Sequence, residues 1–303
     1  MTDVATTTKN ANPDSDCVNC PACGAQNLQP ETYQFDSGRG TTPWARCCDC
    51  NTYFMTSNYD AASETDHSRD MAWGNEEQGA ALNLRKRQGF IATLDRIEEL
   101  GYGGSRILDV GCSFGGILME ATKRGFDCSG VDIVPEAVEY VRMQGCRAEE
   151  CCSLNDCTLF DEDNQADVIS VLDAHIYWPD QPGELRAAHK MLRDDGLLVI
   201  RAVTKSAFVT AGRYVGAISP GISRKLIRRA IADHRFSMPL KSLVRTVEDS
   251  GFEILDATPR GAQHTNEMPL GARAAYKVGT VLWHGFGVSV APTSLIFARK
   301  KAA

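Results

Sequence analysis

Four cysteines in two close pairs carry the clearest chemistry in the sequence. Cys20 and Cys23 stand in CPAC, and Cys47 and Cys50 stand in CCDC, so that two residues separate the members of each pair. Two such pairs, joined by a loop of just over twenty residues, allow four thiolates to surround one Zn²⁺ tetrahedrally. Because four thiolates leave no coordination position for a substrate, we expect a structural rather than a catalytic metal.

Two further cysteines leave the choice of ligands open. Cys17 also forms a C-x-x-C pair with Cys20, and Cys48 lies inside the second pair. We favour the set that begins at Cys20 because Gly24 follows CPAC and allows a tight turn around the metal. The whole pattern, with the aromatic Phe54 after the second pair, resembles a zinc ribbon.

A second candidate site is a glycine-rich turn between two apolar runs. Residues 107–110 (ILDV) have the composition of a buried strand, and Gly111 and Gly115 lie in the turn that follows. Glycine lets a ligand lie against the backbone, and the start of the next helix presents unpaired N–H groups to a polar or anionic ligand. Asp132 ends the next apolar run, where a carboxylate can accept hydrogen bonds from both hydroxyls of a ribose.

The glycines alone would fit a packing turn with a solvated Asp132 equally well. Two details favour a ligand site. Asp109 precedes the first glycine, and Ser113 stands where a complete G-x-G-x-x-G would have another glycine. That departure suits a ligand with a sulfonium and a carboxylate better than a dinucleotide pyrophosphate.

The elements that must hold these residues alternate between strand and helix. Apolar runs such as CSGVDI and GLLVIRAV are separated by helix-like stretches that stop at glycine. This alternation favours a parallel sheet covered by helices on both faces. A helix is expected over residues 81–101, and a less regular segment interrupts the pattern at about 204–238.

DVGCSFGG followed by GVDI resembles the first two motifs of the class I S-adenosylmethionine-dependent methyltransferases. ADVISVLDAHIYWPDQPGELRAAHKMLRDDGLLVIRA is similar to their fourth strand, following helix and fifth strand, and HRFSMPLKSLVRTVEDSGFEIL is similar to a later segment. The resemblance covers roughly residues 80–300. It implies an α/β fold with a Rossmann-like, seven-stranded, mostly parallel sheet, helices on both faces, and S-adenosyl-L-methionine as cofactor.

The same resemblance assigns cofactor contacts at eight positions: Asp109, Gly111, Cys112, Gly115, Asp132, Ile133, Leu172 and Asp173. The residue that contacts the adenine amine stays open among Glu149, Glu150 and Asp156. We expect four parts along the chain: a disordered tail over 1–16, the zinc ribbon over 17–56, a linker over 57–80, and a methyltransferase domain over 81–303 with a helical insertion at about 204–238.

Catalytic candidates follow the fourth strand of the domain. His175 is expected near the methyl donor and is our first candidate for a general base, although a histidine satisfied by backbone hydrogen bonds is an equal alternative. His234 is a second candidate, and it would also suit the C-terminal end of a helix. Tyr177 and Trp178 could wall the acceptor pocket or simply pack under the loop.

Composition limits the partners. The formal net charge of −7 and pI near 5.4 exclude a generally basic surface, so a nucleic acid is an unlikely partner. A basic amphipathic stretch at 222–235 could contact an anionic substrate or lie peripherally on a membrane, or it could be a solvated face.

No apolar run is long enough to span a bilayer. With no secretory signal and 12 cysteines, a cytoplasmic location with structural zinc is expected.

The sequence therefore predicts an S-adenosylmethionine-dependent methyltransferase that acts by in-line methyl transfer on a small-molecule, sugar- or lipid-linked acceptor. Two alternatives are a methyltransferase for rRNA or tRNA that recognises RNA through the zinc ribbon, and a non-catalytic zinc-ribbon binding protein that keeps the cofactor fold.

Overall fold

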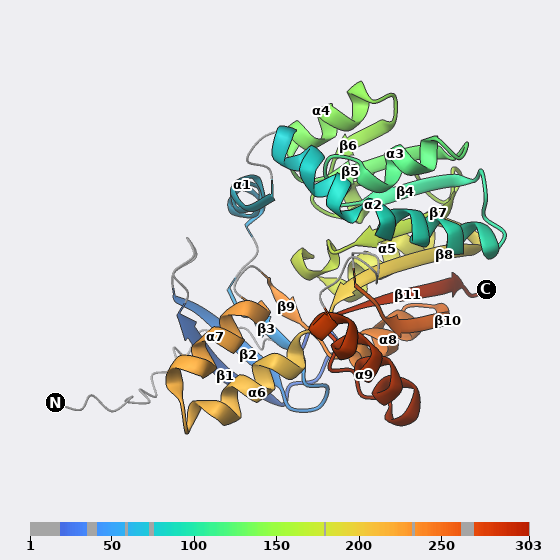
Figure 1. The fold of residues 1–303 in the computed structure, drawn as a ribbon. Coiled ribbons are helices and arrows are strands. Elements are labelled where there is room, and N and C mark those ends of the chain that lie inside the picture. The colour runs from blue at the N-terminus through green and yellow to red at the C-terminus, as the bar shows by residue number, and fades with distance from the viewer. Residues whose placement is uncertain are drawn as a thin grey trace.

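The computed structural model describes residues 19–34, 41–57, 60–72, 76–178, 180–231, 234–261 and 270–302. The predicted tail over 1–16 and the alternative ligand Cys17 lie outside these residues. Two sheets organise the described chain, a large one and a small one (Figure 1).

The large sheet has seven strands in the order β10-β11-β8-β7-β4-β5-β6. All neighbours pair in parallel except β11, which runs antiparallel to both β8 and β10. This architecture confirms the predicted Rossmann-like, mostly parallel sheet. Its strands are β4 (Arg106–Val110), β5 (Asp127–Asp132), β6 (Arg147–Glu150), β7 (Ala166–Leu172), β8 (Leu192–Val203), β10 (Phe252–Pro259) and β11 (Thr293–Lys300).

Helices bury both faces of this sheet, which explains why its strands are apolar almost throughout. Along β4, Ile107 faces one layer and Leu108 the other, as the two-residue period of a strand requires. The first layer contains α2 (Glu76–Glu99), α3 (Gly116–Thr122) and α4 (Pro135–Met143). The second contains α5 (Gln181–Met191) and α8 (Leu240–Asp249). Helix α9 (Leu270–Phe286) lies between β10 and β11 in the chain.

The small sheet joins two segments that are far apart in the sequence. It has the order β1-β2-β3-β9, with β1 (Leu28–Gln34), β2 (Thr41–Cys47) and β3 (Tyr53–Met55) from the cysteine-rich segment. Strand β9 (Phe236–Ser237) comes from the predicted insertion and pairs antiparallel with β3.

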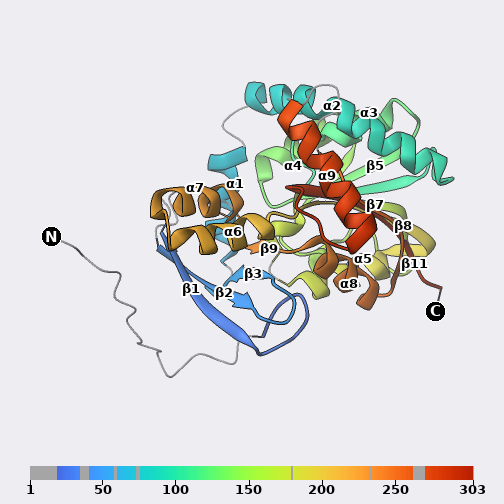
Figure 2. The same cartoon turned by 60° about the horizontal axis from the view of Figure 1, so that its bottom comes forward.

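The insertion also contributes α6 (Ser206–Gly216) and α7 (Pro220–Ile231), which lie beside the small sheet in both views (Figures 1 and 2). Trp44 and Tyr53 of the small sheet share one buried cluster with Val209, Ile227 and Ile231 of the insertion. The cysteine-rich segment and the insertion therefore fold as one structural unit.

Residues 57–80, predicted as a linker, contain helix α1 (Ala61–Ala72) and the start of α2. The segment is polar because α1 is held by an ion pair rather than by a broad apolar face. Glu64 and Arg235 are both buried, with Oε1 and Nη1 2.8 Å apart. Arg235 also donates to the carbonyl of Ser57 at 3.0 Å. Such a helix cannot be recognised from hydrophobic periodicity.

Across the described residues, each helix is too short or too polar to cross a membrane.

Candidate active site

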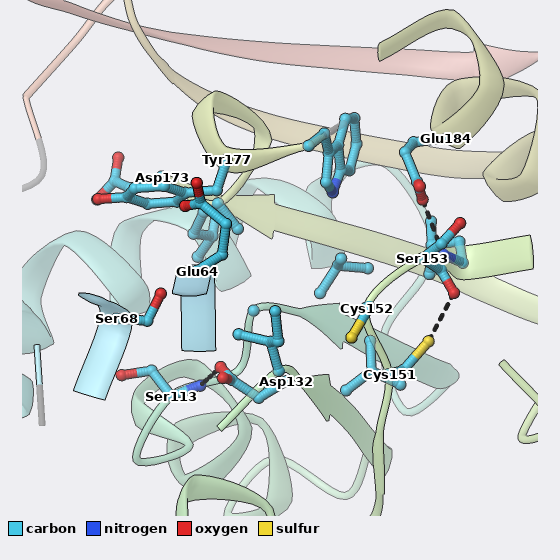
Figure 3. Close-up of a pocket in the computed structure, with 18 of the residues that line it drawn as sticks. Glu64, Ser68, Ser113, Asp132, Cys151, Cys152, Ser153, Asp173, Tyr177 and Glu184 are labelled. Carbon is cyan, nitrogen blue, oxygen red and sulfur yellow. Dashed lines mark hydrogen bonds between the residues drawn. The ribbon is translucent and has the colours of Figure 1, made fainter. Parts of the chain in front are cut away.

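A cavity opens at the carboxyl ends of β4, β5 and β7 (Figure 3). This edge of an open parallel sheet is where ligands of α/β proteins bind. Three groups of residues surround it: the turn after β4 with the end of β5, the loop after β6, and the loop after β7 together with α1 and α2.

The turn after β4 depends on left-handed backbone conformations. Gly111, Ser113 and Gly115 have φ values of 69°, 57° and 64°. A β-carbon on Gly111 would lie 2.5 Å from the β-carbon of Ala174, so only glycine fits between the two strand ends. The amide of Gly111 donates to the carbonyl of Val131 at 2.8 Å, which ties the turn to β5. The resulting backbone cradle borders the cavity through Gly111 and Ser113.

Asp132 closes the other side of this cradle. Its Oδ2 accepts the amide N–H of Ser113 at 2.9 Å, and its Oδ1 accepts the amide N–H of Val134 at 2.9 Å. Burial raises the pKa of Asp132 to about 6, against the lowering effect of these backbone donors. Figure 3 shows Asp132 beside Ser113 at the floor of the cavity. The carboxylate is therefore fixed in position with lone pairs still available to a ligand.

Five of the eight predicted cofactor residues line the cavity: Gly111, Asp132, Ile133, Leu172 and Asp173. The other three residues lie behind the residues that line the cavity. The Cys112 side chain is buried in the core against α3 and β5. Gly115 is the N-cap of α3. Asp109 is buried and accepts a 2.6 Å hydrogen bond from the Ser170 hydroxyl.

Asp109 should make stability depend on pH. Burial raises its pKa to about 7, although the Ser170 hydroxyl and Arg201 act in the opposite direction. A raised folded-state pKa means that the folded protein holds a proton that the unfolded chain has lost, from about pH 4 to about pH 7. The free energy of unfolding contributed by this group therefore falls as the pH rises through that window.

We expect urea titrations to show this effect against an Asp109→Asn variant. From about pH 5 to about pH 8, the unfolding free energy of the unmutated protein should fall relative to that of the variant by on the order of 2 kcal/mol. Asp132 titrates in both proteins, so its contribution cancels. If the difference in unfolding free energy between the two proteins stayed constant with pH, the raised pKa assigned to Asp109 would be contradicted.

Asp173 joins two cations at the opposite wall. Its carboxylate lies 3.1 Å from Lys86 Nζ and 2.9 Å from Arg201 Nη2. Burial alone would raise the pKa of Asp173, but Arg201 and Lys86 outweigh it and hold the pKa well below its usual value. Its φ of 71° is the left-handed region that Asp tolerates better than most residues. Two cations around one carboxylate leave an excess positive charge beside the cavity.

The two candidate general bases do not line the cavity. His175 lies in the short 3₁₀ turn η2 (His175–Tyr177) and is only 1% exposed. Burial lowers the pKa of His175 to about 4 and that of His234 to about 3. In the part of the chain that the structure describes, Nδ1 of each ring has no hydrogen-bond partner. Tyr177 and Trp178, two and three residues after His175, do line the cavity.

The wall after β6 consists of Cys151, Cys152, Ser153 and Leu154. Glu184 of α5 anchors it by accepting the amide N–H of Leu154 at 2.8 Å. The three residues considered for the adenine amine, Glu149, Glu150 and Asp156, lie outside the cavity lining. Sequence reasoning missed this wall because neutral residues after a strand carry no local chemical signal.

Helices α1 and α2 complete the cavity with Glu64, His67, Ser68, Leu82 and Lys86. Figure 3 places Glu64 and Ser68 on the same side as Asp173 and Tyr177. These residues were missed because residues 57–80 were interpreted as a linker. The spacing of Glu64, His67 and Ser68, at i, i+3 and i+4, was the one available signal that they share a helix face.

The four predicted metal ligands converge elsewhere, in the cysteine-rich segment. The Sγ atoms of Cys20, Cys23, Cys47 and Cys50 all lie within 4.8 Å of one another. The pairs Cys20–Cys50 and Cys23–Cys47 are each 3.6 Å apart. Tetrahedral zinc with Zn–S bonds of about 2.3 Å separates its sulfurs by about 3.8 Å. The thiol arrangement therefore fits one zinc ion, and the exposed Cys48 is not part of the cluster.

The domain that contains this cavity is similar to known methyltransferases. A family model described as a methyltransferase domain matches residues 82–257. The ubiquinone biosynthesis O-methyltransferase of Pseudomonas paraeruginosa is 26% identical over 164 residues, which cover 52% of this chain and 69% of that protein. The protein of the same name from Xanthomonas oryzae is 27% identical over 125 residues, which cover 39% of this chain and 52% of that protein.

Among solved structures, the chain is similar to a proposed S-adenosylmethionine dependent methyltransferase from Listeria monocytogenes. The TM-score is 0.50 at 14% identity, and the match covers 71% of this chain and 99% of the other. At this identity the similarity concerns the fold alone.

Proposed function

The chain belongs to the methyltransferase-domain family, and from that premise we propose that its cavity binds S-adenosylmethionine and that the methyl group is transferred to a small-molecule, sugar- or lipid-linked acceptor. The observation that carries this proposal is the pairing of the Gly111 cradle with the buried carboxylate of Asp132 at adjacent strand ends. The cradle leaves room for a ligand against the backbone, and the carboxylate suits two ribose hydroxyls.

The chemistry of the walls supports one orientation of the cofactor. Ile133, Leu154 and the neutral loop after β6 offer an apolar slot for the adenine. Gly111 and Ser113 would hold the amino-acid end. The wall formed by Asp173, Tyr177 and α1 would then face the acceptor. When bound, the cofactor supplies a methyl group on a sulfonium sulfur, which an acceptor takes by in-line displacement.

The chain's own task is to position the acceptor and exclude water. Tyr177 and Trp178 would stack against an acceptor ring or chain, and the excess positive charge around Lys86 would favour an acceptor with an ionisable hydroxyl. His67 lines this wall and is placed to receive a proton. His175 and His234, which lie behind the wall, stay predictions for that role. The names of the ubiquinone-biosynthesis relatives support a lipid-linked acceptor.

We also propose that the four-cysteine cluster binds one structural zinc. Four thiolates would close the coordination sphere, and Cys20 and Cys47 are buried within the same core cluster as Phe54 and Phe236. The metal would therefore hold the small sheet and the insertion against the main domain.

Transfer of a radiolabelled methyl group tests the proposed function. The purified protein should release S-adenosylhomocysteine and label a lipid extract or a prenylated phenol, and it should not label ribosomal or transfer RNA. Label recovered only in RNA would assign the protein to the alternative RNA-modifying class. Tight binding of S-adenosylmethionine with no transfer to any extract would favour a non-catalytic binding protein.

A further inference from the structure

The hairpin formed by α6 and α7 has a charge distribution unlike that of the rest of the chain. Residues 204–231 contain six basic residues and no acidic residue, whereas the whole chain carries a net charge of −7. A solvated surface helix normally mixes both signs of charge. This segment therefore concentrates positive charge on one part of an acidic protein.

The two sides of the hairpin differ. Its inner side is anchored, because Val209, Ile227 and Ile231 pack against Trp44 and Tyr53 of the small sheet. Its tip instead exposes large apolar side chains: Tyr214 is 78% exposed, Ile218 88% and Ile222 54%. Folding does not require these three side chains at the surface, since the anchored side already supplies the packing.

Cations flank the apolar tip. Arg224, Lys225 and Arg229 are exposed, and no acidic partner is found for these three among the described residues. Ile222, Lys225 and Arg229, at i, i+3 and i+7, share one outward side of α7. Arg213 differs, because it is paired with Glu31 at 2.8 Å. Apolar side chains flanked by cations match the chemistry of a bilayer surface, where headgroups carry negative charge above the acyl chains.

We propose that the α6–α7 hairpin docks the protein onto anionic lipid bilayers, with Tyr214, Ile218 and Ile222 entering the headgroup region and Arg224, Lys225 and Arg229 contacting lipid phosphates. A nucleic acid could form ion pairs with the cations, but it offers no apolar surface to contact Ile218 at the tip. The hairpin leads directly to the cavity: Arg235, four residues after α7 ends, is paired with Glu64 in the cavity wall. Docking would thus bring the acceptor side of the cavity toward the bilayer.

Vesicle sedimentation tests this docking without any methylation readout, so its failure is distinct from failure of the proposed function. The full chain should sediment with vesicles of phosphatidylcholine and phosphatidylglycerol and should stay in the supernatant with phosphatidylcholine alone. Neutralising Arg224, Lys225 and Arg229 together to glutamine should weaken binding about 100-fold. An Ile218→Ser variant should weaken it about tenfold.

A matched control removes three exposed cations elsewhere, by Arg186→Gln, Lys241→Gln and Arg245→Gln, and should bind vesicles like the unmutated chain. Unchanged melting temperatures would show that all variants are folded. Three outcomes would overturn the proposal: equal binding to neutral vesicles, no binding to anionic vesicles, or an Arg224/Lys225/Arg229 variant that loses affinity for a short RNA while its vesicle binding is unchanged.

Discussion

An Asp132→Ala variant should bind S-adenosylmethionine at least about 100-fold more weakly than the unmutated protein. Each hydrogen bond from a ribose hydroxyl to a carboxylate is worth about 1.5–3 kcal/mol, and two would be lost. The substitution also removes the acceptor for the amides of Ser113 and Val134, which holds the turn after β4 against β5. An Asp132→Asn variant, which keeps one acceptor oxygen, should show an intermediate affinity.

Titration calorimetry measures this effect directly. Asp127→Ala is the matched control, because Asp127 begins the same strand, is exposed, and lies 3.6 Å from Arg147 in a surface ion pair. It should leave the affinity unchanged, since surface pairs of this kind contribute little. An Asp132→Ala variant that binds within about threefold of the unmutated protein would disprove the assigned role of this carboxylate.

The second large effect is expected at the cysteine cluster. A Cys47→Ser variant should lose its zinc and destabilise the protein by on the order of 5 kcal/mol, since structural zinc contributes about 10–16 kcal/mol in isolated finger peptides. Cys47 is buried in a core cluster that also contains Leu243 and Val247 of α8. The damage should therefore spread beyond the small sheet into the main domain.

Metal analysis and thermal unfolding test this prediction together. The unmutated protein should contain one zinc ion per chain, and so should a Cys48→Ser variant, because Cys48 is exposed and outside the cluster. Melting temperatures should follow the metal content. Equal zinc content in Cys47→Ser and Cys48→Ser would show that a different set of cysteines binds the metal.

The main sheet could be predicted from the sequence because its strands are buried on both faces. Runs such as ILDV and GLLVI need no alternation of polar residues, and each is followed by a recognisable turn or helix. Helix α2 was also predicted, but its apolar residue Leu84 is 73% exposed. That residue lies in the part of α2 that borders the cavity and not in the part that packs on the sheet.

The candidate site was predictable where its chemistry is local. Gly111 and Asp132 lie within one strand–turn–helix–strand unit. Their separation in the sequence therefore predicts that they lie close together at adjacent strand ends. The wall after β6 and the contribution of α1 depend on contacts between distant segments, such as Glu64 with Arg235 and Leu154 with Glu184. Single-sequence patterns contain no record of such pairings.

The small sheet illustrates the same limit. The cysteine spacing predicted its metal cluster, but β9 has only two residues and pairs with a strand that lies more than 180 residues earlier. A pair of residues is too short for any periodic signal. The insertion was therefore predicted as helical, and its union with the cysteine-rich segment was not foreseen.

A crystal structure grown with S-adenosylhomocysteine tests the central claim most directly. We predict that the ribose lies on the Asp132 carboxylate, with the amino-acid end over Gly111 and the adenine between Ile133 and Leu154. A ligand bound elsewhere, or a cavity that stays closed by protein side chains at saturating ligand, would contradict it.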